Sequence, residues 1–337
     1  MRVRLDVNMC VNLHPNRHHA RELSSPYDGC VQLPRHVRRA VEERAEAVGF
    51  AALKRAAAAM SDAYREGRTA RLGAAERTAA YLVTRMPATY AAAHAVLREV
   101  RTRLGETAIE SVLDAGAGTG AASLAARECW GQATRITMIE RDGAFSEVAR
   151  QWLPDARALA DDLMRVENLP QHDLVVAAYS LGELGRPMAE RLWKAARVAL
   201  VAIEPGTPQG YSLCLGIRDQ LLAAGAHMVA PCPAAMACPL TPPDWCHFAA
   251  RVERSSLHRR IKDAELGYED EKFSYVALAR EPVALPRARI IRRPHYAPGL
   301  IELRTCTPAG LRTQQAGKRD REAYRGARHA GWGDALS

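Results

Sequence analysis

Three cysteines and five prolines fall within residues 230–248 of this 337-residue chain. Proline at this density prevents a regular helix or strand, so we expect an irregular loop that needs something to order it. A fourth cysteine follows a predicted strand over 300–305. Four converging thiolates can bind a tetrahedral zinc ion or an iron–sulfur cluster. The candidate metal ligands are Cys232, Cys238, Cys246 and Cys306.

The spacing of these cysteines favours a cluster over a zinc ion. Structural zinc sites commonly use cysteine pairs separated by about two to four residues, whereas gaps of five, seven and fifty-nine residues separate the cysteines here. Proline follows Cys232 and Cys238, as it follows a cysteine in ferredoxin-type runs. We interpret His247 as a polar loop residue rather than a spare ligand. Cys129 and Cys214 lie in helical patterns and are expected to be buried apolar residues.

Two of the same cysteines permit an alternative. Pro231–Cys232 and Thr305–Cys306 are similar to the Pro-Cys and Thr-Cys pairs of cytosine C5 methyltransferases, in which a thiolate attacks the base. In that family the Pro-Cys pair follows the fourth strand, whereas Cys232 follows the sixth predicted strand here. This alternative also leaves Cys238 and Cys246 without a role, so we prefer the metal cluster.

The second chemical pattern is the loop 114–120, which has the sequence D-x-G-x-G-x-G. An apolar run predicts a buried strand before it, and alanine-rich sequence predicts a helix after it. Glycines let the backbone approach a ligand, and the helix start offers unpaired N–H groups. The spacing differs from the dinucleotide G-x-G-x-x-G and resembles motif I of class I S-adenosylmethionine (SAM) methyltransferases, in which the acid faces the methionine amino group. The resemblance implies SAM binding by Asp114, Gly116, Gly118 and Gly120.

Later strand ends supply further candidates. Ligands of a doubly wound parallel sheet lie at the carboxyl ends of its strands. We expect Glu140 to accept hydrogen bonds from the ribose hydroxyls of SAM, Asp162 to lie at the adenine edge, and Tyr179 to complete the pocket. The alternation of strands with helical segments predicts that sheet. The expected strands are 135–140, 157–160, 173–179 and 197–203.

Charge and composition suggest both the partner and the segments of the chain. Residues 1–110 carry 18 Lys/Arg against 12 Asp/Glu, residues 111–246 carry 11 against 15, and residues 247–337 carry 18 against 11. Basic flanks around an acidic core favour nucleic-acid binding. No apolar run reaches ~18 residues, so we expect no membrane partner. The expected segments are a leader without regular structure (1–32), a helical region (33–105), a SAM-binding Rossmann-like core (106–229), a cysteine-cluster loop with C-terminal strands (230–311) and a basic, partly unstructured tail (312–337).

Eight motifs, taken together, resemble the methyltransferase-like small-ribosomal-subunit protein family. The resemblance runs from about residue 33 to residue 334, and its eukaryotic members assist assembly of the mitochondrial small subunit. One departure is Ala234, where the family often has histidine. The motifs are Arg85–Tyr90, Asp114–Gly120, Leu181–Leu184, Glu204–Pro208, Ala230–Pro233, Asp244–Phe248, Glu269–Tyr275 and Trp332–Asp334.

The resemblance implies an α/β class I SAM-methyltransferase fold, a four-iron, four-sulfur (4Fe-4S) cluster on the four cysteines, and binding to small-subunit rRNA, to the small ribosomal subunit or to its precursor. We expect a SAM-dependent, rRNA methyltransferase-like protein of ribosome assembly or translation, monomeric when free. Its expected location is the cytoplasm in bacteria and the mitochondrial matrix for eukaryotic relatives. The alternative is a non-catalytic factor that uses SAM and the cluster structurally. No catalytic residue is assigned, because residues 177–180 lack the Asn/Asp-Pro-Pro-aromatic motif of amino methyltransferases.

Overall fold

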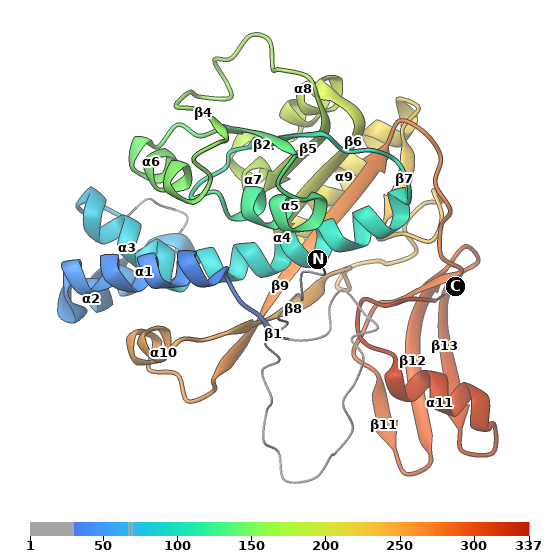
Figure 1. Ribbon diagram of the computed structural model, residues 1–337. Helices are drawn as coiled ribbons and strands as arrows, with labels where there is room; N and C mark the ends of the chain where they lie inside the picture. The colour runs from blue at the N-terminus through green and yellow to red at the C-terminus, as the bar shows by residue number, and fades with distance from the viewer. Residues whose placement is uncertain (1–29, 67, 69, 337) are drawn as a thin grey trace, which may run out of the picture.

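The computed structural model describes residues 30–66, 68 and 70–336, so most of the expected leader lies outside the described residues. A nine-stranded sheet forms the centre of the molecule, in the order β1-β8-β9-β6-β5-β2-β3-β4 (Figure 1). β7 and β8 both pair with one edge of β9: β8 pairs with its first half, residues 268–273, and β7 with its end, residues 277–279. Within the described residues, no helix combines the length and apolar character needed to cross a membrane.

Five parallel strands make up the heart of this sheet. From β2 the chain adds β3 and β4 on one side, and it then crosses back to add β5 and β6 on the other. A ligand crevice is expected where the direction of winding reverses, beside the carboxyl ends of β2 and β5. The fold is therefore the expected class I methyltransferase, Rossmann-like arrangement. The strands are β2 Ser111–Ala115, β3 Arg135–Ile139, β4 Arg157–Leu159, β5 His172–Ala178 and β6 Ala196–Pro205.

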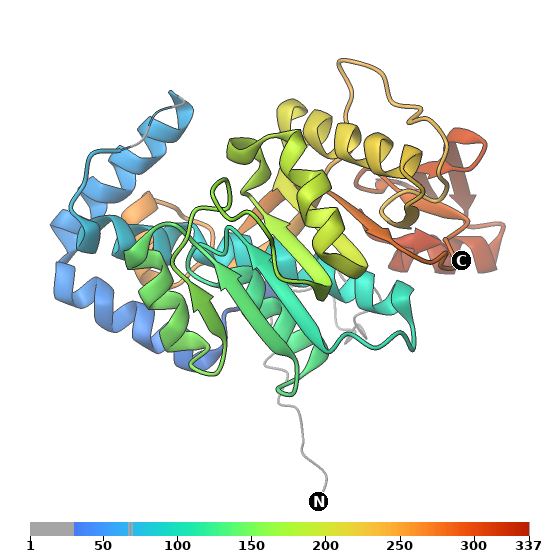
Figure 2. The ribbon, with the colours of Figure 1, turned by 90° about the horizontal axis from the view of Figure 1, so that it is seen from above.

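Helices cover both faces of the sheet, as the buried strands require. Alternate residues of β2 point to opposite faces: Val112 packs with α4 and α5, and Leu113 packs with α8 and α9. Figure 2 shows the resulting three layers. The helices of the core are α5 Ala121–Trp130, α6 Gly143–Trp152, α7 Leu181–Leu184, α8 Arg186–Ala195 and α9 Pro208–Ala223.

The predicted N-terminal helical region is present, with the break at Gly49, whose φ is 83°. The last of its helices, α4, lies along the sheet beneath α5 (Figure 1). Buried alanines on both helices allow this close approach, including Ala92 and Ala125. The helices are α1 Arg35–Val48, α2 Phe50–Arg65, α3 Ala74–Thr84 and α4 Met86–Leu104.

The long strand β9, Tyr268–Ala279, joins the central sheet although it lies far beyond residue 229. It runs antiparallel to β6 along one edge, and its other edge pairs with β7, His227–Ala230, and β8, Phe248–Glu253. The short helix α10, Ser256–Lys262, connects β8 to β9. The strands predicted after the cysteine loop are therefore part of the core sheet.

A second, five-stranded sheet forms a C-terminal lobe, and here one prediction was wrong. The chain after Arg312 was expected to lack regular structure in part, yet β13 pairs with β12 over eight residues and α11 packs on the sheet. Its apolar core includes small residues such as Ala316 and Ala327, which give a weak sequence signal. The elements are β10 Ala288–Ile290, β11 His295–Ala297, β12 Leu300–Thr307, β13 Gly310–Gly317, α11 Arg321–His329 and β14 Ala335–Leu336.

The end of the expected leader also needs correction. Cys30 and Val31 form β1, which pairs in parallel with Arg251 and Val252 of β8. Regular structure therefore begins before residue 33. A two-residue strand at a sheet edge has no periodicity that could reveal it in a sequence.

Candidate functional site

The loop after β2 turns at three glycines whose φ angles are positive: 78° for Gly116, 54° for Gly118 and 80° for Gly120. Other residues rarely adopt such angles, so the turn depends on glycine. A Cβ on Gly116 would lie 2.6 Å from the Cβ of Ser180, whereas a Cβ on Gly118 would meet nothing nearer than the Tyr81 hydroxyl at 3.9 Å. Gly116 is therefore needed for packing, and Gly118 has space beside it for a ligand.

Asp114, at the end of β2, is a buried carboxylate with unused hydrogen-bonding capacity. Its Oδ2 accepts a hydrogen bond from the Ser123 hydroxyl at 2.6 Å. Its Oδ1 is buried and has no partner among the described residues, and the same is true of Thr119 Oγ1 in the same loop. Burial raises the pKa of Asp114 to about 6. Buried polar atoms are seldom left unpaired, so these two oxygens favour a ligand that brings donors.

Glu140 follows β3 and faces the glycine loop. Its Oε2 accepts a hydrogen bond from the Gly118 N–H at 2.8 Å, and its Oε1 accepts one from the Asp142 N–H at 2.7 Å. The structure thus brings Glu140 to the loop that begins at Asp114. Each carboxylate oxygen can accept a second bond, so a role toward ribose stays open as a prediction.

Tyr179 follows β5 and joins a polar network that the sequence did not reveal. Its φ of 58° is in the left-handed region, and its hydroxyl donates to Glu271 Oε1 of β9 at 3.0 Å. Arg85, between α3 and α4, donates to the same oxygen at 3.3 Å. Burial would lower the pKa of Arg85, but the charge of Glu271 raises it. The motif Arg85–Tyr90 did not indicate this network, because Glu271 lies 186 residues from Arg85 in the sequence.

Asp162 lies beyond β4, at the carboxyl edge of the sheet. Its Oδ1 accepts a hydrogen bond from the Met164 N–H at 2.9 Å, within its own turn. Its predicted role at the adenine edge therefore stays a prediction. Glu204, at the end of β6, accepts from the N–H groups of Leu181 and Gly182, and burial raises its pKa to about 7.

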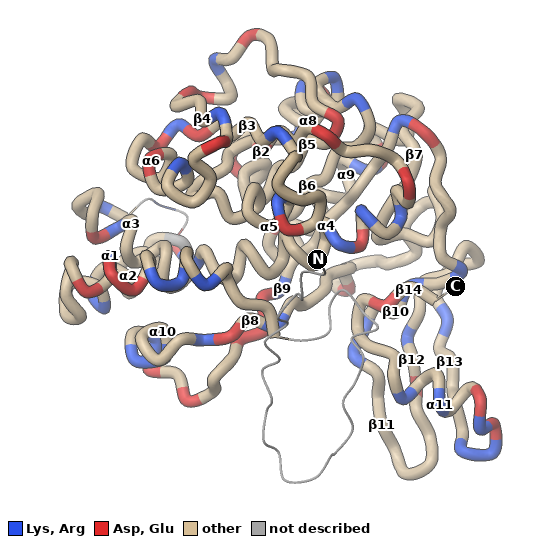
Figure 3. The backbone as a smooth tube through the Cα atoms, viewed as in Figure 1, with Lys and Arg blue, Asp and Glu red and all other residues tan. Residues whose placement is uncertain are grey.

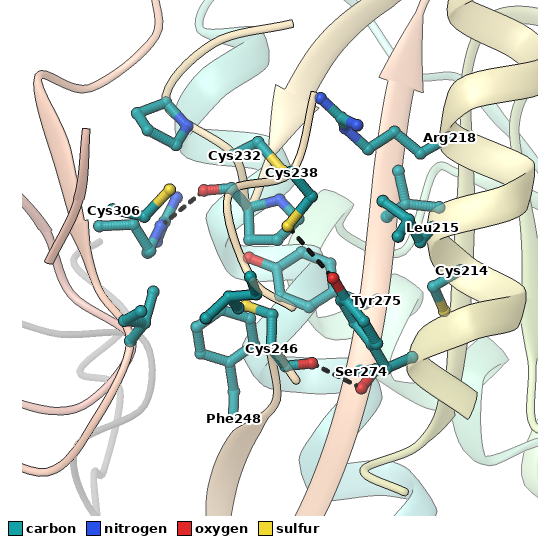
Figure 4. A pocket seen from close by; sticks show the side chains of 17 residues that line it. Cys214, Leu215, Arg218, Cys232, Cys238, Cys246, Phe248, Ser274, Tyr275 and Cys306 are labelled. Carbon is teal, nitrogen blue, oxygen red and sulfur yellow. Dashed lines mark hydrogen bonds between the residues drawn. The ribbon is translucent and has the colours of Figure 1, made fainter. Parts of the chain in front are cut away.

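The four predicted cysteine ligands line one cavity of about 50 Å³ (Figure 4). Three come from the loop between β7 and β8, and Cys306 comes from β12 of the C-terminal lobe. One face of α9 forms the opposite wall, through residues spaced at helical intervals. The wall residues are Tyr211, Cys214, Leu215 and Arg218.

Burial and mutual proximity set the protonation of these thiols. Burial raises the pKa of Cys232, of Cys246 and of Cys306, the last to about 12, and other cysteines of the set raise each value further. The hydroxyl of Tyr211 donates to Cys238 Sγ at 3.2 Å. A metal or cluster bound here would take the cysteines as thiolates, because the thiolate is the form that coordinates metals.

Cys214 and His247 differ from the four predicted ligands. Cys214 lines the same cavity but is a buried residue of the α9 wall, as expected, and burial, then the charge of Glu204, raises its pKa. The ring of His247 lies between Trp245 and Trp332, with centroid distances of 5.2 Å and 5.0 Å. His247 does not line the cavity.

In the described part of the chain, no three His, Cys, Asp or Glu side chains lie close enough to hold a single metal ion. The four cysteines surround a cavity instead.

A family model described as the mitochondrial small ribosomal subunit Rsm22 matches residues 75–337. The chain belongs to this family. One relative, the human "Ribosome assembly protein METTL17, mitochondrial", is 28% identical over 289 residues, which are 76% of this chain and 61% of that protein. The chain thus spans about three fifths of the length of this relative. The resemblance inferred from the eight motifs is confirmed.

Solved structures with a similar arrangement are more distant. The plantazolicin methyltransferase BpumL is 13% identical, with a TM-score of 0.39, over 73% of this chain and all of its own. The precorrin-6y C5,15-methyltransferase of Geobacter metallireducens is 16% identical, with a TM-score of 0.36, over 55% of this chain and 86% of its own.

Proposed function

We propose that this member of the Rsm22 family binds SAM and small-subunit rRNA, and that it acts on the small ribosomal subunit or its precursor. We further propose that its four clustered cysteines hold a structural 4Fe-4S cluster. The observation that carries the proposal is the placement of the Asp114–Gly120 loop at the switch point of the sheet, in a chain that belongs to a ribosomal-subunit family.

The loop residues fit SAM. The buried Oδ1 of Asp114 lacks a partner among the described residues, and the methionine amino group of SAM is a cationic donor. Gly118 has room beside it for the ligand, and Glu140, which accepts a hydrogen bond from the Gly118 N–H, would offer acceptors to a ribose diol. SAM supplies a methyl group on a positively charged sulfur, and the chain would contribute mainly its orientation toward a nucleophile.

SAM affinity is expected to depend on pH through Asp114. Burial raises the pKa of this carboxyl to about 6, so the free protein holds a proton there at lower pH. The ammonium of SAM needs the ionised form, so affinity should fall about tenfold for each pH unit below that value. Calorimetry between pH 4.5 and 7.5, in steps of about one unit, checks this. Asp114→Asn should bind weakly with little pH dependence, and a wild-type affinity independent of pH would contradict the assignment.

The cysteine cavity fits an anionic metal cluster. Four thiols converge there, and Arg218 and Arg289 line the same cavity. Both arginines are buried, at 3% and 1% exposed. Cations in such a place favour thiolates over neutral thiols. The cluster would link the loop after β7 to β12, and it would therefore fasten the C-terminal lobe to the SAM-binding core.

The C-terminal lobe offers a basic surface for RNA. Figure 3 shows cationic residues gathered at the start of α11 and in the turn before it. Within the described residues these side chains are exposed and form no ion pair with a carboxylate, so their charge is available to phosphates. They are Lys318, Arg319, Arg321 and Arg325.

Neutralising this surface should weaken RNA binding. We expect the triple substitution Arg319→Ala, Arg321→Ala and Arg325→Ala to flatten the dependence of log K on log salt. The slope should fall by about 0.7–0.9 for each phosphate that the variant no longer neutralises. Filter binding of small-subunit rRNA at several salt concentrations measures this slope.

A double substitution of paired arginines is the control. Arg39 and Arg150 are exposed but already paired with Glu43 and Glu147, at 3.0 and 3.3 Å, so Arg39→Ala with Arg150→Ala should change little. Equal slopes for the triple variant and the wild type would exclude this surface from RNA contact.

A second candidate function is a non-catalytic factor with the same ligands. The network of Tyr179, Arg85 and Glu271 favours it, because these polar side chains beyond the carboxyl end of β5 are already bound to one another. Transfer of label from methyl-labelled SAM to small-subunit rRNA distinguishes the two. Transfer supports an enzyme, whereas SAM and RNA binding without transfer supports the structural factor.

A further inference from the structure

Arg218 is a buried cation whose surroundings do not balance its charge. It lies on α9, on the helix face that lines the cysteine cavity, and its side chain is 4% exposed (Figure 4). Its carboxylate partner is Asp219, at 2.5 Å, but the side chain of Asp219 is 57% exposed. An ion pair with such an exposed partner is weak because water screens it.

The other contacts of Arg218 also bring no full negative charge close to its guanidinium. One Nη donates to the carbonyl of Met236 in the cysteine loop. Arg218 lines the cavity together with Cys232 and Cys306. Nε is buried and has no partner in the described part of the chain. A buried cation without a close anion destabilises the folded protein.

Arg289, the second arginine of the cavity, differs from Arg218. Its three nitrogens donate to the carbonyl of Pro231 at 2.9 Å, the carbonyl of Gly333 at 2.7 Å and Oε1 of Glu99 at 2.7 Å. The side chain of Glu99 is itself 5% exposed, so this pair is buried and balanced. Arg289 therefore joins three segments of the fold, and its charge is balanced by Glu99. The charge of Arg218 is not balanced in this way, so it can interact with an anion in the cavity.

A cubane cluster with four thiolate ligands would supply the missing negative charge. It is an anion in both of its common oxidation states, and it becomes more negative when reduced. A cation beside it stabilises the reduced form more than the oxidised form, which raises the reduction potential.

We propose that Arg218 is the charge partner of a cluster held by Cys232, Cys238, Cys246 and Cys306, and that its guanidinium raises the reduction potential of that cluster. The proposal rests on the cluster put forward under the proposed function. It assigns Arg218 a positioning and electrostatic role, distinct from the four ligands and from Arg289.

The test compares Arg218→Met with Arg218→Lys in full-length protein purified without oxygen. Methionine keeps much of the volume and removes the charge, whereas lysine keeps the charge. Iron content and a redox titration followed by electron paramagnetic resonance are measured for both. We expect Arg218→Met to shift the ratio of reduced to oxidised cluster at least tenfold toward the oxidised form, which is about 59 mV for one electron. Arg218→Lys should stay near the wild-type potential, as should Arg150→Met, an exposed control on α6.

The outcomes separate this inference from the one on which it rests. If the wild-type protein contains no iron, the cluster is excluded, and so is the proposed role of Arg218. A loaded wild type with equal potentials in the methionine and lysine variants would overturn the role of Arg218 alone. If the methionine variant loses iron, retention of iron by the folded lysine variant supports the proposal. Loss of iron from both folded variants would overturn it, because charge would then not be the property that matters.

Discussion

Replacing Cys238 with serine is expected to leave the anaerobically purified protein colourless. The wild type should be brown, with broad absorption near ~400 nm and about four iron atoms per chain, because thiolate-ligated iron absorbs there. The Cys238 thiol accepts a hydrogen bond from Tyr211 at 3.2 Å. A serine hydroxyl can keep this bond, but it lacks the soft sulfur that iron–sulfur clusters select. The measurements are iron analysis and the visible spectrum.

Loss of the cluster should also loosen the structure around it. The loop between β7 and β8, which the structure describes throughout, contains no regular element, so metal binding would supply much of its folding energy. Limited proteolysis should therefore cut Cys238→Ser within residues 231–247 much faster than wild type. Cys129→Ser is the matched control, because Cys129 is buried in α5 and does not line the cavity. A colourless wild type that carries one zinc ion per chain would refute the cluster, and the four cysteines would then be zinc ligands.

Gly118→Arg should reduce SAM affinity at least about a hundredfold, or about 2.8 kcal/mol. Two effects combine: the φ of 54° strains any residue other than glycine, and the new side chain would enter the space beside Tyr81. The Gly118 N–H also donates to Glu140, so the ribose side of the pocket would move with it. Isothermal calorimetry measures the change.

Gly131→Arg provides the control for this substitution. Gly131 also has a positive φ, 91°, and a Cβ there would meet nothing within 4 Å. It caps the C-terminal end of α5, whereas the glycine loop lies at the N-terminal end of that helix. This variant carries similar backbone strain but should bind SAM like the wild type. Equal binding by Gly118→Arg and wild type would show that the ligand does not lie against the loop.

Local patterns in the sequence were sufficient to predict the five parallel strands at the heart of the central sheet. The loop 114–120 and the strands on either side are coded by neighbours in the chain: apolar runs, an acid at the strand end and glycines in fixed order. The helices of the N-terminal region were predicted for the same reason, since Gly49 and Pro87 mark their boundaries. The four cysteines were recognisable because few other roles explain three of them in one proline-rich loop.

What the sequence did not reveal depends on distant partners. Glu271 meets Tyr179 from 92 positions away, and Arg289 meets Glu99 from 190 positions away. No periodicity links such residues, so the polar network beside the glycine loop and the two arginines of the cysteine cavity were both missed. The regular structure after Arg312 was missed for another reason. The polar strand β13 is held in place by its pairing with β12. Backbone pairing produces no apolar pattern in the sequence that could predict the strand.

The position of β9 has a consequence for the order in which the chain folds during synthesis. β6 ends at Pro205, and its neighbour β9 begins only at Tyr268. A growing chain therefore carries an open edge on β6 until β9 has left the ribosome, and open edges favour aggregation. Cys232, Cys238 and Cys246 all emerge in this interval, and Cys306 emerges after it. The set of four cysteines is therefore complete only after every strand of the central sheet has been synthesised.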